Sequence, residues 1–493
     1  MDSERQRCFL RDHLSMQRSS VCETGLPRGK EVRIVSLSQL PGPDVPGFGG
    51  GTMKRSSALW PLFLLFWEFW IPEQVALGGG WDNGIIGPRG SAMGTAFAGL
   101  ADDPSAIFYN PAGTAMLEPE QGISATVRYN ATYLKYEYPE GRASPTGEDS
   151  ARSYLMGVIP DIFYYHRFGM FTAGLGVYVP YGGLAGSWPD VPFQVNLDQF
   201  MAVASFTPSL AWAITPKLAV GAGVNIYFGF MKSKVRMDKI PLAMFQPLFP
   251  EDVFEIVYDV FEGYVSLPLK QDFYAKGLAV GYNVGALYKP FKRLSLGLTM
   301  RSGADVNLSG PSDIVLYLAD PLAIYVHSDL EIKYKLPYLV VGGVAFWILP
   351  NLVAVADVQY NGWGRLEDIR LTFKSLNYTQ VNRTGYEDTV KFMVGTEYTF
   401  RERYSVRLGY MYTPSNIKHE EFLSYQSWDT DMHNFSVGFG YSWQNISLHA
   451  LAMISPGEWT EKHFDDPLDP IGKPAGKYAT FNQTYGIGCL WYF

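Results

Sequence analysis

The sequence predicts an antiparallel up-and-down β-barrel that spans a membrane, and three observations support this fold class. First, the chain repeats segments of about ten or more residues in which apolar residues alternate with polar or small ones. Second, Tyr, Trp and Phe gather at the ends of these segments, as in the interfacial girdles of membrane barrels. Third, short turns alternate with long loops, which is the usual asymmetry of an outer-membrane barrel.

The composition agrees with this class. Aromatic residues make up 15% of the 493 residues, Gly is abundant at 50, and the mean hydropathy is -0.04. Helical membrane proteins are more apolar, because each span needs about 20 apolar residues in a row. The net charge of -8 argues against a nucleic-acid partner. The seven His residues are scattered, and Cys489 would be the one Cys left after processing, so we expect no metal, no cofactor and no intrachain disulfide.

The beginning of the chain is interpreted as a targeting segment and not as part of the folded protein. The long apolar run 58–71 is too short to span a bilayer. It follows a basic pair and precedes a small-x-small sequence, which is the pattern of a secretory signal peptide. We therefore expect a signal peptide at 53–78 that begins at Met53, and we interpret 1–52 as an extension from an upstream start codon chosen in error. A genuine disordered extension is the alternative.

Residues 121–493 are predicted to form the barrel. Counting the alternating segments gives about fourteen strands, and this even number is typical of bacterial barrels. In one such segment, Leu294 and Leu296 share a face while Ser295 and Gly297 share the other. In a soluble sandwich the apolar face would point inward, and alternation alone does not distinguish the two cases. The predicted strands lie near 121–137, 153–166, 168–180, 199–214, 217–236, 276–289, 293–308, 328–348, 351–373, 386–400, 403–413, 430–443, 445–455 and 478–493.

The last predicted strand alternates up to the end of the chain, and its final residue is Phe493. A terminal aromatic residue that closes such a strand resembles the signal by which the bacterial barrel-assembly machinery recognises its clients. We therefore expect this machinery and outer-membrane lipid as partners, and the outer membrane of a Gram-negative-type bacterium as the location. A soluble strand that ends on Phe by chance is the alternative.

Residues 79–120 do not alternate and are dominated by small residues. Small residues suit a backbone packed tightly in a confined space, and about fourteen strands enclose a lumen that side chains alone do not fill. We therefore predict a hatch (plug) in the lumen, with a short helical stretch at Ser91–Ala101.

The same region carries a family resemblance. The runs Gly90-Ser91-Ala92-Met93-Gly94 and Asn110-Pro111-Ala112-Gly113 resemble the N-terminal hatch of the FadL/TodX family of outer-membrane transporters. The hatch motif residues are Asn110, Pro111 and Ala112. Further matches follow in the family's order at Tyr181-Gly182, Arg301-Ser302, Leu336-Pro337, Trp363 and Arg407-x-Gly409. The resemblance covers 79–493.

The resemblance implies a function. Family members carry long-chain fatty acids or aromatic hydrocarbons. The substrate is caught in an apolar groove between two outer loops, passes to a pocket in the lumen, and leaves sideways through a gap at a kinked third strand under control of the hatch. We therefore expect a transporter of hydrophobic small molecules, monomeric and not an enzyme.

Two predicted outer loops, 237–275 and 310–327, are unusually apolar for segments that face water, and part of the first has helical spacing. They indicate a shared substrate groove. Its candidate residues are Phe245, Leu248, Phe249, Phe254, Phe261, Leu316, Tyr317, Leu322 and Tyr325. The alternative is that the two loops pack on each other as a cap.

Basic residues in the lumen are candidates to hold a substrate carboxylate by charge-assisted hydrogen bonds. They are Arg128, Arg236, Arg301, Lys391 and Arg407. The alternative is that they pair with acids of the lumen or the hatch, such as Asp102, Asp103, Asp357 and Glu397.

The third strand is rich in residues that weaken strand pairing, because Pro lacks a ladder donor and Gly has no side chain to pack. The candidate residues for a lateral-gate kink are Gly174, Gly176, Pro180 and Gly182.

Two rival functions make different demands on the sequence. An outer-membrane lipid-modifying enzyme needs a Ser-His pair with an orienting partner at one rim, and His433 and His449 lack that context. A general porin needs charged constriction rings and a polar long loop, whereas the long loops here are apolar.

Overall fold

The computed structural model places the parts of the chain from which the fold is read. It describes residues 32–36, 82–141, 149–188, 195–237, 240–241, 264–265, 269–319, 322–423, 429–464 and 475–493. The expected signal peptide at 53–78 lies outside the described residues.

The described elements are mostly long strands. The helical ones are α2 (Pro88–Ser91), α3 (Ala106–Tyr109), η2 (Pro111–Met116), η4 (Trp363–Arg365), η5 (Lys374–Leu376) and η6 (Glu420–Phe422). The strands are β1 (Val32–Ser36), β2 (Gln121–Glu137), β3 (Ser150–Phe168), β4 (Phe171–Trp188), β5 (Val195–Thr215), β6 (Leu218–Met237), β7 (Ile240–Pro241), β8 (Tyr264–Val265), β9 (Leu269–Phe291), β10 (Leu294–Arg301), β11 (Ala304–Ala319), β12 (Leu322–Leu336), β13 (Leu339–Leu349), β14 (Leu352–Asn361), β15 (Asp368–Phe373), β16 (Tyr378–Arg383), β17 (Thr389–Phe400), β18 (Tyr404–Thr413), β19 (Met432–Trp443), β20 (Ile446–Pro456), β21 (Thr460–Lys462) and β22 (Gly476–Tyr492).

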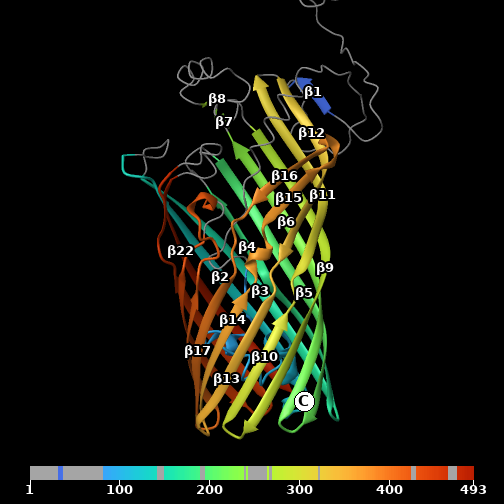
Figure 1. The fold of residues 1–493 in the computed structure, drawn as a ribbon, viewed down its shortest axis with the longest axis vertical. Helices are drawn as coiled ribbons and strands as arrows, with labels where there is room; N and C mark the ends of the chain where they lie inside the picture. Colours follow the sequence, from blue (N-terminus) through green and yellow to red (C-terminus); the bar gives the residue numbers. More distant parts are fainter. Residues whose placement is uncertain are drawn as a thin grey trace, which may run out of the picture.

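These strands close into an antiparallel barrel, because β2 pairs with β3 on one side and with the last strand, β22, on the other (Figure 1). Two barrel strands each consist of two parts. β10 and β11 are the parts of one strand, because both pair with β9. β13 and β12, which pair with β10 and β11, are the parts of the next strand. Counted this way, the described residues form fourteen barrel strands. The predicted fold class and strand number are confirmed.

The barrel wall has an apolar outer face and a polar inner face. Along β9, Leu278 and Val280 are 61% and 64% exposed. On the inner face, Asn225 of β6 and Ser295 of β10 are fully buried. This is the arrangement of a barrel in lipid, where the apolar side chains contact the membrane. Among the described residues, no helix has the length and apolar character needed to cross a membrane.

The two ends of the barrel differ. Tight turns join β3 to β4, β5 to β6, β9 to β10 and β17 to β18 at the lower end in Figure 1, and the chain also ends there. The strands extend further at the other end, where the hairpin β15–β16 adds to β12. In outer-membrane barrels the short turns face the periplasm and the long connections face outward.

The structure corrects two predicted boundaries. The predicted loop 310–327 is instead the extended hairpin of β11 and β12, because its apolar residues alternate along paired strands. The predicted strand 351–373 is two strands separated by η4. The break follows Asn361, where Gly362 lies so close to the ring of Tyr338 that a Cβ would come within 2.2 Å of it.

The N-terminal segment, residues 82–117, folds across the inside of the barrel in its lower half (Figure 1). Its helices α2 and α3 are short, and the helix expected at Ser91–Ala101 does not form, because Gly94 and Thr95 have positive φ. The segment is buried: α2 contacts β19 and β20, and η2 contacts β5, β6 and β9.

One described strand precedes this segment. β1 pairs antiparallel with the outer end of β12, with Val32 opposite Val326. It lies within the range interpreted as an upstream extension, so the start at Met53 stays a prediction.

Candidate functional site

The N-terminal segment docks on glycines of the barrel wall. A Cβ on Gly297 would lie 2.0 Å from the carbonyl oxygen of Ala98, and one on Gly409 would lie 2.0 Å from the amide nitrogen of Gly94. Gly395 meets Met93 in the same way, at 2.4 Å. The backbones therefore approach more closely than any side chain allows. Sequence reasoning treated these glycines as ordinary polar-face positions, and only their parity on the inward face hinted at the contact.

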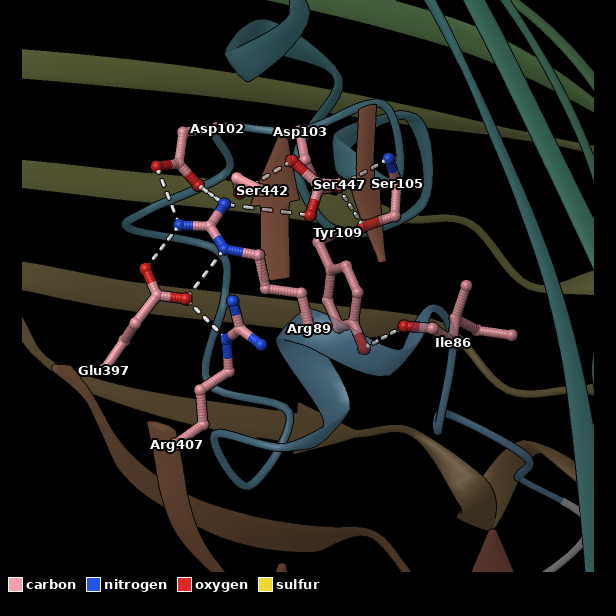
Figure 2. Close-up of polar contacts among 10 residues, drawn as sticks. All are labelled: Ile86, Arg89, Asp102, Asp103, Ser105, Tyr109, Glu397, Arg407, Ser442 and Ser447. Atoms are coloured by element: carbon pink, nitrogen blue, oxygen red, sulfur yellow. Dashed lines mark hydrogen bonds and ion pairs between the residues drawn. The ribbon is translucent and has the colours of Figure 1, made fainter. Parts of the chain in front are cut away.

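Ion pairs anchor the same segment to the wall (Figure 2). Arg89 of α2 donates from Nη2 and Nε to the carboxylate of Glu397 on β17, both at 2.9 Å, and it also pairs with Asp102. Glu397 in turn accepts from Nε of Arg407 on β18. Asp103 lies 3.8 Å from Arg89. The Arg89 guanidinium therefore connects α2 both to Asp102, later in the same segment, and to Glu397 on β17, which in turn binds Arg407 on β18.

Burial perturbs the acidic and phenolic groups of this cluster. Burial raises the pKa of Asp103, and the nearby Arg89 guanidinium and the hydrogen bonds from Ser105 oppose that rise only in part. Burial also raises the pKa of Tyr109, whose hydroxyl donates to the carbonyl of Ile86 at 2.7 Å. Tyr109 therefore stays neutral and acts as a structural donor inside the segment.

Two more of the predicted cations are paired. Arg128 on β2 binds Asp161 on β3 through Nε and Nη2, each at 2.9 Å, and both side chains are fully buried. Lys391 on β17 pairs with Asp82 at 2.6 Å. With Arg407, three predicted carboxylate-binding candidates thus have a carboxylate partner within the protein.

Arg301 differs from them. It is buried, its Nη2 donates to the carbonyl of Phe108 at 2.8 Å, and its guanidinium lies 4.0 Å from the centroid of the Phe108 ring. Among the described residues it has no ion-pair partner, and its Nε has no hydrogen-bond acceptor. Arg301 therefore has no carboxylate within ion-pair distance among the described residues, and the nearest negative charge that acts on it, that of Asp82, already pairs with Lys391.

Other unused donors surround Arg301. The hydroxyls of Tyr181 and Tyr227 interact electrostatically with it. Neither hydroxyl makes a hydrogen bond of good geometry, and the polar groups beside them are Arg301 for Tyr181 and Asn225 for Tyr227. The indole nitrogen of Trp363, whose ring is 6.3 Å from that of Tyr181, is also unpartnered. Buried donors without acceptors are rare in folded proteins and call for an explanation. Arg301 and the two tyrosines, which interact with it directly, are therefore the candidate site for a group that accepts hydrogen bonds.

A cavity of about 110 Å³ lies between the N-terminal segment and the wall at this level. Arg301, Asp357 and Lys391 line it, together with Phe108 and Asp82 of the segment. Above it an apolar cluster fills the lumen. The cluster includes Tyr181, Tyr227, Ile314, Leu316, Trp363 and Phe373. The lumen therefore combines a polar cavity with an apolar column on its outer side.

The hydrogen-bond ladder between β3 and β4 is interrupted. Pairing runs from Tyr154 to Met156 and resumes only at Ile162. On its other side, β4 pairs with β5 through two irregularities, one between Tyr178 and Tyr181 and one after Gly182, which has a φ of 68°. Pro180 and Gly182 therefore lie in the interruption, on the third barrel strand.

Gly174 and Gly176 do not belong to this interruption. Both have regular partners on β3 and β5. Their small size has another cause, since a Cβ on Gly174 would lie 2.9 Å from Ile107 of the N-terminal segment, and one on Gly176 would lie 3.0 Å from Phe163.

The start of the N-terminal segment covers the interrupted part of β4. The amide of Asn83 donates to the carbonyl of Pro180 at 2.8 Å, and Asp82 forms a bridge with Tyr181. Asn83 also accepts from Arg128 at 3.2 Å. The segment therefore touches the weakened wall, the paired arginine and the cavity at once.

Two sets of predicted residues fall elsewhere. Arg236 is exposed and shares the outer face of β6 with Lys232, because the lumen-facing positions there are Ser233 and Val235. Arg236 was predicted to face the lumen, and this prediction is wrong, because the neighbouring residue Val235 takes the lumen-facing position. In the predicted groove, Leu316 is buried, and Tyr317 and Tyr325 are half-buried on the β11–β12 hairpin. The groove candidates whose side chains lie outside the described residues are Phe245, Leu248, Phe249, Phe254, Phe261 and Leu322.

A closed barrel with an apolar outer face, a buried polar lumen and a segment folded across that lumen defines a transport barrel of the outer membrane. The family described as "Outer membrane protein transport protein (OMPP1/FadL/TodX)" matches residues 86–450. The chain belongs to this family.

Solved structures share the fold. A Pseudomonas aeruginosa FadL homologue is 18% identical with a TM-score of 0.68, over 86% of this chain and 100% of that one. The Ralstonia pickettii toluene transporter TbuX is 16% identical with a TM-score of 0.60, over 83% and 98%. The Pseudomonas putida toluene transporter TodX is 14% identical with a TM-score of 0.63, over 85% and 99%. No curated protein matches the sequence.

Proposed function

We propose that this outer-membrane transporter takes up long-chain fatty acids, with the carboxylate held at Arg301. The observation that carries the proposal is the set of unused donors formed by Arg301, Tyr181 and Tyr227. A carboxylate accepts several hydrogen bonds and brings the negative charge that Arg301 lacks. The apolar column above it suits an alkyl chain.

The route follows from the neighbouring elements. Residues 79–120 act as the hatch, and the substrate leaves sideways where the β3–β4 ladder is interrupted. In support, Asp82 and Asn83 cover that part of β4 and also border the cavity. A ligand that enters the cavity competes with these contacts. The outer groove, with Phe249 and Tyr317 among its candidates, remains a proposal for the first capture step.

Arg301→Gln tests the carboxylate proposal. Removal of a charge-assisted hydrogen bond costs about 1.5–3 kcal/mol, so oleate should bind the purified variant roughly 10- to 100-fold more weakly. Toluene binding should change little, because a neutral hydrocarbon needs no cation. The measurement is a binding isotherm for each ligand in detergent, with Arg236→Gln, an exposed arginine on β6, as the control.

The two ligands also separate the alternatives. The solved relatives include two toluene transporters by title, and the Tyr181, Tyr227 and Trp363 rings suit an aromatic hydrocarbon as well. Unchanged oleate binding in Arg301→Gln would favour the aromatic substrate. An equal loss for both ligands would assign Arg301 a purely structural role.

A further inference from the structure

A groove on the outside of the barrel wall is separate from the lumenal cavity, although Tyr133 and Phe481 of the groove are next in sequence to Thr132 and Asn482 of the cavity. It is formed by β2, β3 and β22 near their outer ends and has a volume of about 330 Å³. It opens where β20 ends at Pro456 while its neighbour β22 continues outward to Gly476. We call it the outer-wall groove.

Its lower row is aromatic. Tyr133 on β2 lies directly between Tyr154 on β3 and Phe481 on β22. The ring centroid of Tyr133 is 4.9 Å from that of Tyr154 and 6.1 Å from that of Phe481. Tyr154 is 51% exposed. This row is on the lipid-facing side at the level where aromatic residues meet the membrane interface.

The next row outward is basic. Lys135 and Arg152 stand directly opposite each other on β2 and β3. Like charges in directly opposed positions destabilise a sheet unless a counter-charge joins them. Lys135 forms an ion pair with Glu137 of its own strand, with the ammonium nitrogen 2.6 Å from a carboxylate oxygen. Arg152 is exposed and has no ion-pair partner among the described residues.

The groove is lined by both cations, Lys135 and Arg152, and by no carboxylate side chain. Because Glu137 pairs with Lys135 from outside the lining, one positive charge, that of Arg152, is left without a carboxylate among the described residues. Trp459 closes the basic row from outside, with the Lys135 ammonium 5.3 Å from its ring centroid. An apolar floor with two cations above it complements a molecule that has acyl chains and an anionic head.

We propose that the outer-wall groove binds a phosphorylated lipid of the outer leaflet, with the phosphate between Lys135 and Arg152 and acyl chains against the aromatic row. The order of the rows matches the bilayer: along β2, Tyr133 precedes Lys135, and β2 runs from the short-turn end toward the outer end. Arginine and lysine together bind phosphate through directed and diffuse charge.

The chain offers a matched comparison. Lys333 on β12 and Arg370 on β15 also stand directly opposite each other. There, however, Lys333 lies 3.3 Å from Glu331 and Arg370 lies 2.9 Å from Asp368, so each cation has its own carboxylate. This pair has the same residue types and no unbalanced charge, and it makes the control variant.

The test uses the full-length protein purified in detergent and loaded with bis-phosphorylated lipid A. Native mass spectrometry should show one tightly retained lipid fewer in the double variant Lys135→Ser/Arg152→Ser than in the wild type. Its affinity for that lipid should fall by roughly tenfold, as expected when charge-assisted hydrogen bonds are lost. The control Lys333→Ser/Arg370→Ser should retain the wild-type number.

Further arms identify the ligand. Dephosphorylated lipid A should bind the wild type and the double variant equally, and Tyr154→Ser should weaken binding of the phosphorylated form. Displacement of the lipid by millimolar inorganic phosphate would show that the groove is a site for a free anion and overturn the proposal. So would an unchanged lipid count in the double variant. Normal uptake of oleate by each variant verifies that the barrel is folded and inserted.

Discussion

At the scale of single residues, the lumen is organised by which cations have partners. Arg89 joins Asp102 to both carboxylate oxygens of Glu397, and Arg407 donates to Oε2 of the same glutamate, which it shares with Arg89. Arg407 and Glu397 are buried and Arg89 is mostly so, which means that each of these charges is stable only while its partner is present. Breaking a buried pair leaves an uncompensated charge, which costs far more than the loss of a surface pair.

Arg89→Gln should therefore loosen the N-terminal segment. The charge of Glu397 would keep only Arg407, and the expected cost is about 3–5 kcal/mol of docking free energy. Hydrogen exchange of residues 82–117 should accelerate strongly. In the control Arg370→Gln, which breaks an exposed pair with Asp368, the change should stay within about 1 kcal/mol. Equal exchange in both variants would contradict the anchoring role of Arg89.

At the scale of elements, the N-terminal segment and β4 work as a pair. Glycines of the wall admit the segment's backbone, and the irregular part of β4 exposes the carbonyl of Pro180, which Asn83 covers. The segment is therefore held firmly at its middle and touches the interruption only with its first two described residues, Asp82 and Asn83.

Gly297→Ala tests the docking surface. The added methyl group would overlap the carbonyl of Ala98, which is backbone and cannot rotate away. Overpacking of this kind costs about 1–3 kcal/mol, so proteolysis of the segment and ion leakage through the barrel should increase. Gly342→Ala, on the opposite face with nothing within 4 Å, is the control. Wild-type conductance in Gly297→Ala would mean that the segment adapts without loosening.

A disulfide between Asp82→Cys and Tyr181→Cys, in a Cys489→Ser background, tests the lateral exit. The two positions form a β-bridge, so their Cα atoms are near enough for a disulfide. Because Tyr181 is also a proposed donor to the carboxylate, the oxidised protein is compared with the reduced form of the same variant. Oxidation should block the uptake of oleate that the reduced form retains, and reductant should restore that level. Each single-cysteine variant serves as a control. Unimpaired uptake by a fully oxidised protein would rule out this exit.

At the scale of the whole molecule, the barrel is inverted relative to a soluble protein. Leu278, Val280 and Ile487 are among the most exposed apolar side chains, and Arg128 and Asp161 are among the most buried groups. Such an exterior suits contact with lipid. Phe493 ends the chain at the short-turn end, where its amide donates to Gln121 on β2 at 3.2 Å.

Phe493→Ser should lower the amount of assembled barrel several-fold, because the terminal aromatic residue is the proposed signal for the assembly machinery. The fraction of heat-modifiable, folded protein in outer-membrane preparations measures this. Phe291→Ser removes an even more exposed aromatic residue at the same end of the barrel and should leave assembly unchanged. Equal amounts of both variants would show that the C-terminal residue is not recognised.

Most of the fold was predictable from the sequence. Period-2 alternation in segments such as 276–289 and 293–308 determined which residues face lipid, because successive side chains of a strand point to opposite faces. The same rule predicted Arg128, Arg301, Lys391 and Arg407 as lumenal. It also puts Arg236 on the lipid-facing side of β6, with Leu218 and Phe228, so the predicted lumenal position of Arg236, which came from the family resemblance, was wrong.

Only the tertiary structure decided which side chains contact each lumenal cation. Alternation places four cations in the lumen but does not say that three of them face carboxylates and that Arg301 meets two tyrosines. Those partners come from strands and turns far apart in the chain, such as Asp82 with Lys391, and their contacts depend on how the barrel closes and how the N-terminal segment crosses it. Local sequence determines which face a side chain takes, whereas the partner on that face is set by packing across the lumen.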